Sequence, residues 1–398
     1  MVEKKGKGKD KEIEKRILLG RPGNTLKMGI VGLPNVGKST TFNLLSKQQV
    51  AAENFMFCTI NPNLAKVEVP DERFDHLVAA YKPKSIVPAS LNILDIAGLV
   101  RGASTGAGMG SAFLSHIQAV DGIYHLVRVF EDEDIQHFDG EVDPIRDLET
   151  IKLELIEKDK QNCEKSLEDA AAKAKRNPQD KAFLLEKETL EKVMGLLNDN
   201  KNVRDKLDWD YKEIDILNKY LFFTAKSGVY LCNLSEEDFI KKKNKYLKKI
   251  VEWVNNNGGG KIIPYSAAFE LKLFEASPDE KKKIIEESKA ESQLGKIINA
   301  GYSSLDLIHY FTAGADEVKC WTIRNGCLAP QAAGVIHTDF ERGFISADVI
   351  KYSNFKEYGG EQGAKKEGKQ STEGKLYVVE DGDIIHFKFN VSDPKKKK

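Results

Sequence analysis

The sequence predicts an α/β fold in which a parallel sheet carries helices on both faces, with an inserted helical hairpin and a smaller C-terminal α+β module. Three observations predict it. Short apolar runs with strand character alternate with helical stretches between residues 27 and 265. Two runs with helical periodicity interrupt this alternation. The last part of the chain returns to short strands joined by turn residues.

The strands of the α/β part are short apolar runs, and a helix from Ser39 to about Leu45 follows the first of them. Crossovers between parallel strands are right-handed and short, so these strands are expected to lie side by side in one sheet. We assign residues 25–147 and 205–300 to this domain and expect residues 1–24 to form a flexible basic tail. The predicted strands are Lys27–Val31, Leu91–Asp95, Ile123–Val129, Val229–Asn233 and Lys261–Tyr265.

The insertion is predicted at residues 148–204. Apolar residues there recur at the spacing of one helix face, in two separate runs. Pro178 stands between the runs and is expected to end the first helix. The pattern therefore favours a helical, coiled-coil-like hairpin over an irregular surface excursion. The two apolar sets are Leu148, Ile151 and Leu155, and Leu190, Val193 and Leu197.

The C-terminal module is predicted at residues 304–390. Asp381-Gly382 has the composition of a hairpin turn between two strands. Residues 355–375 are rich in Gly, Lys and Glu and are expected to form a loop, and residues 391–398 a basic tail. The predicted strands are Val318–Ile323, Gly343–Val349, Leu376–Glu380 and Ile384–Asn390.

Composition limits the classes of function. Of the 398 residues, 31% are charged and 41% hydrophobic, which is typical of soluble globular proteins. Basic and acidic residues number 61 each, so bulk charge does not indicate a polyanion partner. Lysines nevertheless cluster in both tails and at 241–249, either as solvated surface or as local contacts for RNA phosphates. Five scattered cysteines without a Cys-x-x-Cys pair indicate reduced thiols, and no apolar run is long enough to span a membrane.

A glycine-rich motif follows the first predicted strand and opens the first predicted helix. It reads Gly-Leu-Pro-Asn-Val-Gly-Lys-Ser from Gly32 to Ser39, the spacing of the P-loop of nucleoside triphosphatases. In such a loop, backbone N–H groups converge on the β- and γ-phosphates, the lysine adds a cation, and the serine hydroxyl ligates Mg²⁺. The expected phosphate contacts are Asn35, Val36, Gly37, Lys38, Ser39 and Thr40.

A second motif, Asp-Ile-Ala-Gly from Asp95 to Gly98, stands at the end of a predicted strand. In P-loop enzymes this aspartate holds Mg²⁺, usually through water, and the glycine N–H meets the γ-phosphate. Thr59 lies between the two motifs, where a switch threonine completes the Mg²⁺ shell; an ordinary loop threonine is the alternative. We therefore expect Mg²⁺ as cofactor, held by Ser39, Thr59 and Asp95.

Two features separate this site from that of a Ras-like GTPase. Leu99 takes the place of the glutamine that orients the attacking water, and a leucine side chain forms no hydrogen bond. Where the guanine-reading Asn-Lys-x-Asp is expected, the sequence reads Asn-Leu-Ser-Glu from Asn233 to Glu236. This change favours adenine, read by backbone groups around Leu234. The expected base contacts are Asn233, Leu234, Glu236, Ser266 and Ala267.

These motifs together resemble the Obg-like ATPases, also called YchF proteins, of the eukaryotic branch. The resemblance extends to Phe-Thr-Ala-Gly at 311–314 and to Ala-Pro-Gln-Ala-Ala-Gly at 329–334, so it covers the chain from about residue 20 to 390. It implies an Obg-type G domain of the TRAFAC class, a helical insertion, and a C-terminal TGS domain with a ubiquitin-like β-grasp fold. It also implies hydrolysis of ATP in preference to GTP, association with ribosomes, and a role in translation control and stress responses.

The family resemblance also implies a substitute for the missing glutamine. A loop histidine is proposed to position the water in this family, and it matches His137, which we treat with Lys38 as catalytic. A neutral imidazole can accept a hydrogen bond from water near working pH. An ordinary surface histidine is the alternative. His116 and His125 are weaker candidates, the latter because it lies inside a predicted strand.

Several functions remain open at this point. The chain is either an ATPase acting as a nucleotide-switched regulator, an Obg-type GTPase that reads guanine by other contacts, or an RNA- or protein-binding module with incidental hydrolysis. Asn35 is the candidate K⁺ contact, because related G domains use an asparagine there to hold this cation. The expected partners are ATP and the ribosome or its RNA, without a membrane or sequence-specific DNA. The chain is expected to be a monomer or weak dimer in the cytoplasm, with a nuclear or nucleolar pool as a second location.

Overall fold

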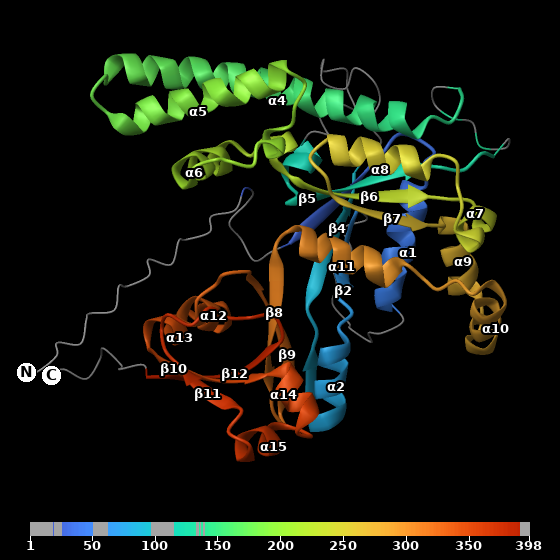
Figure 1. The fold of residues 1–398 in the computed structure, drawn as a ribbon, viewed down its shortest axis with the longest axis vertical. Coiled ribbons are helices and arrows are strands. Elements are labelled where there is room, and N and C mark those ends of the chain that lie inside the picture. The colour runs from blue at the N-terminus through green and yellow to red at the C-terminus, as the bar shows by residue number, and fades with distance from the viewer. Residues whose placement is uncertain are drawn as a thin grey trace, which may run out of the picture.

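Two β-sheets organise the part of the chain that the structure describes. This computed structural model describes residues 19, 26–50, 63–96, 115–132, 135, 137 and 140–390. The first sheet has the strand order β2-β4-β1-β5-β6-β7, and helices cover both of its faces (Figure 1). The predicted parallel sheet is confirmed, with one addition, an edge strand β2 that runs antiparallel to β4. The strands are β1 (Lys27–Val31), β2 (Leu64–Glu68), β4 (Ser90–Asp95), β5 (Gly122–Arg128), β6 (Ser227–Asn233) and β7 (Lys261–Tyr265).

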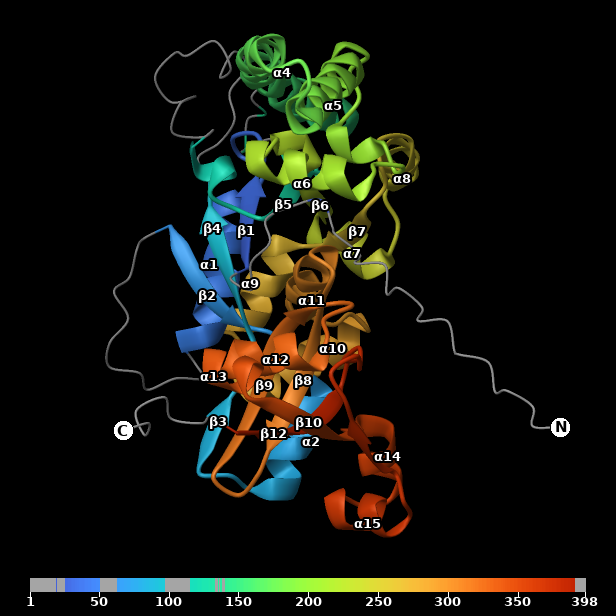
Figure 2. The same cartoon turned by 90° about the vertical axis from the view of Figure 1, so that its left-hand side faces the viewer.

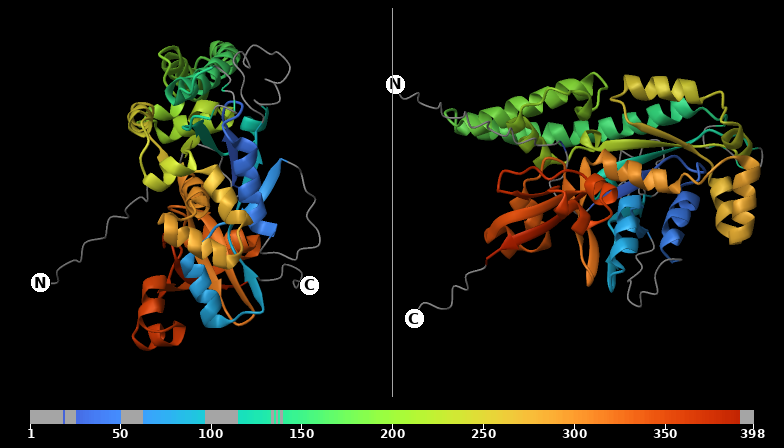
Figure 3. Two further views of the ribbon diagram at one scale, coloured as in Figure 1. Left: turned by 90° about the vertical axis from the view of Figure 1, so that its right-hand side faces the viewer. Right: turned by 60° about the horizontal axis from the view of Figure 1, so that its bottom comes forward.

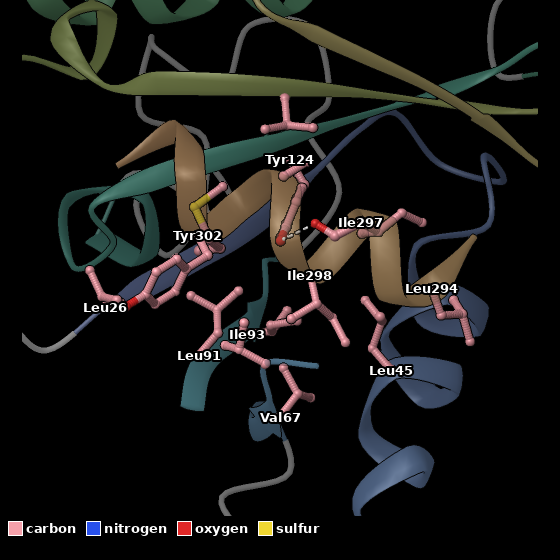
Figure 4. Close-up of a cluster of buried hydrophobic side chains, with 14 of the residues drawn as sticks. Leu26, Leu45, Val67, Leu91, Ile93, Tyr124, Leu294, Ile297, Ile298 and Tyr302 are labelled. Atoms are coloured by element: carbon pink, nitrogen blue, oxygen red, sulfur yellow. Dashed lines mark hydrogen bonds between the residues drawn. The ribbon is translucent and has the colours of Figure 1, made fainter. Parts of the chain in front are cut away.

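The helices of this domain pack apolar faces against the sheet. Figure 4 shows α11 lying across the strands, with the Tyr124 side chain of β5 pointing at it. The Tyr124 hydroxyl is fully buried and donates to the Ile297 carbonyl at 2.9 Å, so the one polar atom of this contact is satisfied. The helices are α1 (Lys38–Val50), α2 (Glu72–Tyr81), α7 (Glu236–Lys241), α8 (Leu247–Asn256), α9 (Ala267–Glu275), α10 (Pro278–Ser288) and α11 (Leu294–Ser304).

The predicted helical hairpin is present as α4 (Pro144–Arg176) and α5 (Lys181–Asn198). Asp143 and Asp180 cap the two helices by accepting hydrogen bonds from backbone N–H groups of their first turns. The apolar cluster of the hairpin also includes Val203, Leu217 and Phe222. The packed helical unit therefore begins before residue 148 and extends beyond residue 204, through α6 (Tyr211–Tyr220). Figures 1 and 3 show it on the side of the first sheet away from the C-terminal sheet.

The C-terminal sheet has the strand order β11-β10-β12-β8-β9-β3. Strands β8 and β12 run parallel and β8–β9 form an antiparallel hairpin, with α12 (Ala329–Ile336) and α13 (Thr338–Arg342) packed on one face. This is the compact α+β module predicted from the sequence. The strands are β3 (Ser85–Val87), β8 (Leu307–Ala313), β9 (Glu317–Arg324), β10 (Phe344–Lys351), β11 (Gln370–Glu373) and β12 (Asp383–Phe389).

Two local predictions in this module were wrong. Residues 376–380 form no strand; Leu376 is 74% exposed, and only Val378 makes an isolated bridge, to Leu328. The predicted loop at 355–375 contains the end of α14 (Tyr352–Glu357), α15 (Glu361–Lys366) and β11. Strand β11 is polar and lies at the sheet edge, where both faces meet solvent, so it lacks the alternation by which strands are recognised.

The two sheets meet at a polar junction built on α2. The Arg73 guanidinium binds Asp71 and, at 2.7 Å, the Asp381 carboxylate in the turn before β12. His309 of β8 contacts Asp71 at 3.2 Å. Strand β3 also pairs with β9, so a segment of the first domain completes the second sheet. Figure 2 shows α2 and β3 beside the C-terminal strands, on the excursion that links β2 to β4.

Candidate functional site

The P-loop leaves β1 and enters α1, as predicted. Asn35 and Gly37 have φ values of 62° and 98°, the left-handed region that lets successive N–H groups face inward. A Cβ at Gly32 would stand 2.6 Å from the Leu126 carbonyl oxygen, and one at Gly37 would stand 2.7 Å from the Asn233 amide nitrogen. Gly32 is therefore required by close packing on a neighbouring backbone, and Gly37 by its positive φ as well as by packing.

Three charged or polar groups of the predicted site converge at the start of α1. The Lys38 ammonium donates to the Leu33 carbonyl at 2.6 Å. Burial lowers the pKa of Lys38 to about 8, although Asp95 opposes this shift. The Ser39 hydroxyl lies 3.5 Å from the Asp95 carboxylate, whose pKa is raised by burial against the opposing effect of Lys38. Thr40 is exposed on α1.

This donor set fits Mg²⁺, which prefers a few hard oxygen ligands together with water and phosphate. Ser39 and Asp95 supply a hydroxyl and a carboxylate within reach of one ion. The ion would neutralise charge that develops on the γ-phosphoryl oxygens. The predicted ligand Thr59, the predicted phosphate contact Gly98, and Leu99 lie outside the described residues.

The base-side residues are tied to the P-loop through Asn233. Its buried amide nitrogen donates to the Val36 carbonyl at 3.0 Å, and its amide oxygen accepts from the Ala267 N–H at 3.0 Å. A second tie joins the Tyr265 and Thr41 hydroxyls at 2.5 Å, while Thr41 also donates to the Gly37 carbonyl. The structure thus connects the P-loop and the predicted base turn by hydrogen bonds, with Asn233 as the brace between them.

The remaining base-side residues have distinct roles. The Leu234 N–H already donates to the Tyr265 carbonyl at 2.8 Å and is not free to meet a base. The Glu236 carboxylate, at the position of the guanine-reading aspartate, accepts from Lys272 at 2.6 Å. The Ser266 hydroxyl is buried and caps α9 by accepting from the Phe269 N–H. Ser266 therefore shapes the turn, and Glu236 is partly neutralised.

His137 is buried rather than exposed. Its Nε2 lies 2.9 Å from an Asp147 carboxylate oxygen on α4, and only 1% of its side chain is exposed. It follows β5, the neighbour of β1 in the sheet, so its loop leaves the sheet beside the P-loop. His125 is different: it stacks on Tyr230 with ring centroids 4.9 Å apart, and burial lowers its pKa to about 3. His125 is therefore a half-buried, neutral residue of β5.

The comparisons with known proteins agree over nearly the whole chain. Residues 27–163 match the family described as 50S ribosome-binding GTPase, and residues 307–390 match the C-terminal domain of YchF GTPases, described as a protein of unknown function. Obg-like ATPase 1 of Gallus gallus and of Homo sapiens are each 55% identical over 96% of this chain and 96% of their own length. The chain belongs to the Obg-like ATPase family. A solved structure of the Schizosaccharomyces pombe YchF GTPase superposes with a TM-score of 0.85 at 49% identity, covering 94% of this chain and 100% of that one.

In this Obg-like ATPase, several residues at the site carried no sequence signal. Tyr265, Thr41 and Lys272 act through contacts with residues far away in the chain. Arg128 at the end of β5 is almost completely buried and binds backbone carbonyls of the following loop. Its only mark in the sequence is its charge within an otherwise apolar strand, and it was not among the residues predicted for the site. In the described part of the chain, no helix is both long and apolar enough to cross a membrane.

Binding of a nucleoside triphosphate to this protein at about pH 8.5 is expected to take up protons. The pKa of Lys38 is about 8 in this structure because the side chain is buried. A bound triphosphate raises this pKa again, so at higher pH the ammonium must regain a proton and affinity falls. Isothermal titration calorimetry in two buffers of different ionisation enthalpy measures this uptake. A Lys38→Arg variant stays charged and is the control; equal heats in both buffers for the unmodified protein would contradict the prediction.

Proposed function

We propose that this protein is a Mg²⁺-dependent ATPase that hydrolyses ATP in preference to GTP and acts as a nucleotide-switched regulator on ribosomes. One observation carries the preference for ATP. At the end of β6, Leu234 takes the place of the lysine that packs across guanine in GTPases. Glu236 takes the place of the aspartate that binds guanine, and its carboxylate accepts a hydrogen bond from Lys272 at 2.6 Å. Each hydrogen bond from guanine to a free carboxylate contributes about 1.5–3 kcal/mol. Because Lys272 partly neutralises Glu236, much of the preference for guanine is lost.

Adenine fits the backbone that remains. No described residue donates a hydrogen bond to the Leu234 carbonyl, which is therefore available to accept from the adenine N6 amine. Guanine presents an O6 acceptor at the same place and would meet this carbonyl with like partial charge. The adenine N1 acceptor requires another donor, because the Leu234 N–H is used by Tyr265. The first N–H groups of α7, which follow Ser235, are the donors nearest in sequence.

For phosphoryl transfer, the chain supplies position and charge. The P-loop N–H groups and the Lys38 ammonium hold the β- and γ-phosphates. Ser39, Asp95 and Thr59 would hold a Mg²⁺ ion, which would offset negative charge on the transferred group. Because Leu99 cannot orient water, His137 takes that task, with its neutral ring accepting a hydrogen bond from the water. Asn35 is retained as the K⁺ contact; equal ATPase rates in K⁺ and Na⁺ would remove that part of the proposal.

The nucleotide preference is tested by competition. ATP is expected to displace a fluorescent nucleotide at a lower concentration than GTP, because the base site lacks a free carboxylate. The double variant Leu234→Lys, Glu236→Asp restores the guanine-reading pattern and is expected to shift the GTP-to-ATP affinity ratio by about 10–100-fold toward GTP. Lys241→Ala, an exposed change at the end of the same helix, is the control. A strong preference of the unmodified protein for GTP would reject the proposal in favour of an Obg-type GTPase.

Ribosome association is supported by the description of the family that matches residues 27–163 and by the lysine clusters of the sequence. Cosedimentation with purified ribosomes in ATP and in ADP is the direct test. A switch requires that the two nucleotides give different bound fractions. Equal binding in both states, with full rescue of function by Lys38→Ala, would instead favour a binding module with incidental hydrolysis.

A further inference from the structure

A small cavity lies between helix α4 and the first sheet, on the side of the sheet away from α11 (Figure 1). Its walls come from α4, α8, strands β5 and β6, and the segments 202–204 and 223–226. Its volume is about 30 Å³. One water molecule needs about 10–15 Å³, so the cavity has room for one small ion or two waters, but not for a phosphate ester or a nucleotide.

The charged side chains that line this cavity are all basic. Lys152, Arg204 and Lys226 line it, and no aspartate or glutamate of the described residues does. Carboxylates outside the lining offset part of this charge, but the groups that an occupant would touch are positive. The electrostatic potential inside the cavity therefore favours an anion. The acidic residues that interact with the lining from outside are Glu149, Asp159 and Asp205.

Three polar side chains of the lining have hydrogen-bonding capacity to spare. Tyr230 is 5% exposed, and its hydroxyl bonds to none of the described residues. The Lys152 side chain is 13% exposed, and within the described ranges its ammonium meets only Glu149, at 3.7 Å, which is too long for a hydrogen bond. The His125 ring stacks on Tyr230 and likewise makes no hydrogen bond to a described residue. Buried donors are costly without an acceptor, so these groups require one between them.

Gly228 on β6 keeps the space beside His125 open. A Cβ at this position would stand 3.1 Å from Nη1 of Arg204 and 3.2 Å from Nε2 of His125. The Arg204 guanidinium is held by the carbonyls of Lys226 at 3.1 Å and Gly259 at 2.8 Å, so its charge is fixed in place. Burial, and then Arg204, lower the pKa of His125 to about 3, so the ring is neutral and donates a single N–H. A cation and a neutral donor are therefore neighbours at this end of the cavity.

We propose that this cavity binds one small inorganic anion of the size of chloride. Tyr230, Lys152 and the neutral ring of His125 donate hydrogen bonds to the ion, and Arg204 and Lys226 supply the positive field. The ion connects α4, which carries Lys152, to strands β5 and β6, and so holds the inserted hairpin on the sheet. The inference does not depend on the proposed function, because the site shares no residue with the phosphate or base contacts.

Chloride is expected to stabilise the protein at constant ionic strength, because an ion that binds only the folded chain stabilises it by mass action. Replacing about 200 mM gluconate by chloride should raise Tm by about 2–4 °C, and the effect should saturate. Tyr230→Phe removes only a hydroxyl and Lys152→Met only a charge, and each should lose at least about half of this shift. Tyr211→Phe and Lys165→Met, exposed on α6 and α4, are the matched controls and should keep all of it.

Anomalous X-ray diffraction from crystals soaked in sodium bromide locates the ion, because bromide replaces chloride and scatters anomalously. The expected result is a peak inside the cavity, within hydrogen-bond distance of Tyr230 and Lys152. Gly228→Ala narrows the cavity and should lose both the peak and the chloride-dependent shift in Tm. A cavity without a peak, or a shift that Tyr230→Phe and Lys152→Met leave unchanged, would overturn the proposal in favour of water. A peak without any shift would be binding at crystal concentration only and would also reject it.

Discussion

Lys38→Ala is expected to lower kcat for ATP hydrolysis by about 10²–10³-fold or more. In this structure the Lys38 ammonium is held inside the P-loop by the Leu33 carbonyl and faces Asp95. It therefore stands where charge develops on the transferred phosphoryl group, and no other described lysine or arginine is bound into the loop. Single-turnover hydrolysis with excess enzyme separates this loss from a loss of binding.

The matched control is Lys66→Ala, which removes an exposed lysine on β2 of the same sheet. It should leave kcat unchanged, because a surface charge at that distance is screened by salt. If Lys38→Ala kept kcat within about threefold while nucleotide still bound, phosphate stabilisation would have to come from the backbone alone. That result would also mean that Lys38 is not the group that takes up a proton when the nucleotide binds.

The phosphate half of the site could be predicted because its chemistry is local. Gly32, Gly37, Lys38 and Ser39 act within one turn between a strand and a helix, and the required conformation leaves a mark in the residue types themselves. Strands β1, β5 and β6 were predictable for a similar reason, since they are almost entirely buried and read as apolar runs. Local sequence therefore indicated both the phosphate cradle and the frame that holds it.

The part of the site that faces the base depends on contacts between residues far apart in the chain, which the spacing of residues in the sequence does not reveal. Asn233 was expected to touch the base, but its amide bridges Val36 and Ala267, and the contact with Val36 spans 197 positions. Leu234 was expected to offer backbone groups to adenine, and the structure shows that its N–H is already used. The Leu234 bond follows from the register of β6 against β7, and the Val36 contact from the place of β6 next to β5 and β1 in the sheet; only the folded sheet determines either.

His137 is another residue whose contacts could not be predicted from the sequence. The family resemblance indicated a histidine that positions water, with an ordinary surface histidine as the alternative, yet the ring is buried against Asp147, ten positions further on. That contact needs the loop to double back onto the first turn of α4, and no periodic pattern encodes such a turn. Charged residues in a first helical turn are common for electrostatic reasons alone, so Asp147 gave no signal by itself.

Asp159→Ala is expected to cost about 3–5 kcal/mol of unfolding free energy. Asp159 is a fully buried residue of α4. Its carboxylate accepts from the Phe223 N–H at 2.9 Å, the Thr224 N–H at 2.8 Å and the Thr224 hydroxyl at 2.7 Å. Alanine leaves these buried donors without a partner and loosens the helical unit from the segment that leads into β6. Urea unfolding monitored by circular dichroism measures the loss, and Asp169→Ala, exposed on the same helix, is the control.

The difference in unfolding free energy between the unmodified protein and Asp159→Ala depends on pH, and this dependence identifies its cause. Burial raises the pKa of Asp159 from 3.8 to about 6, in spite of the three hydrogen bonds that oppose the shift. Between these values the folded protein binds the proton more tightly than the unfolded chain, so the contribution of Asp159 to stability falls as pH rises through this window. The gap between the unmodified protein and Asp159→Ala should therefore narrow from about pH 4 to pH 6 and stay constant above it. A gap that widened over this range would mean that hydrogen bonding to the carboxylate outweighs its burial, and that Asp159 is charged in the folded protein throughout.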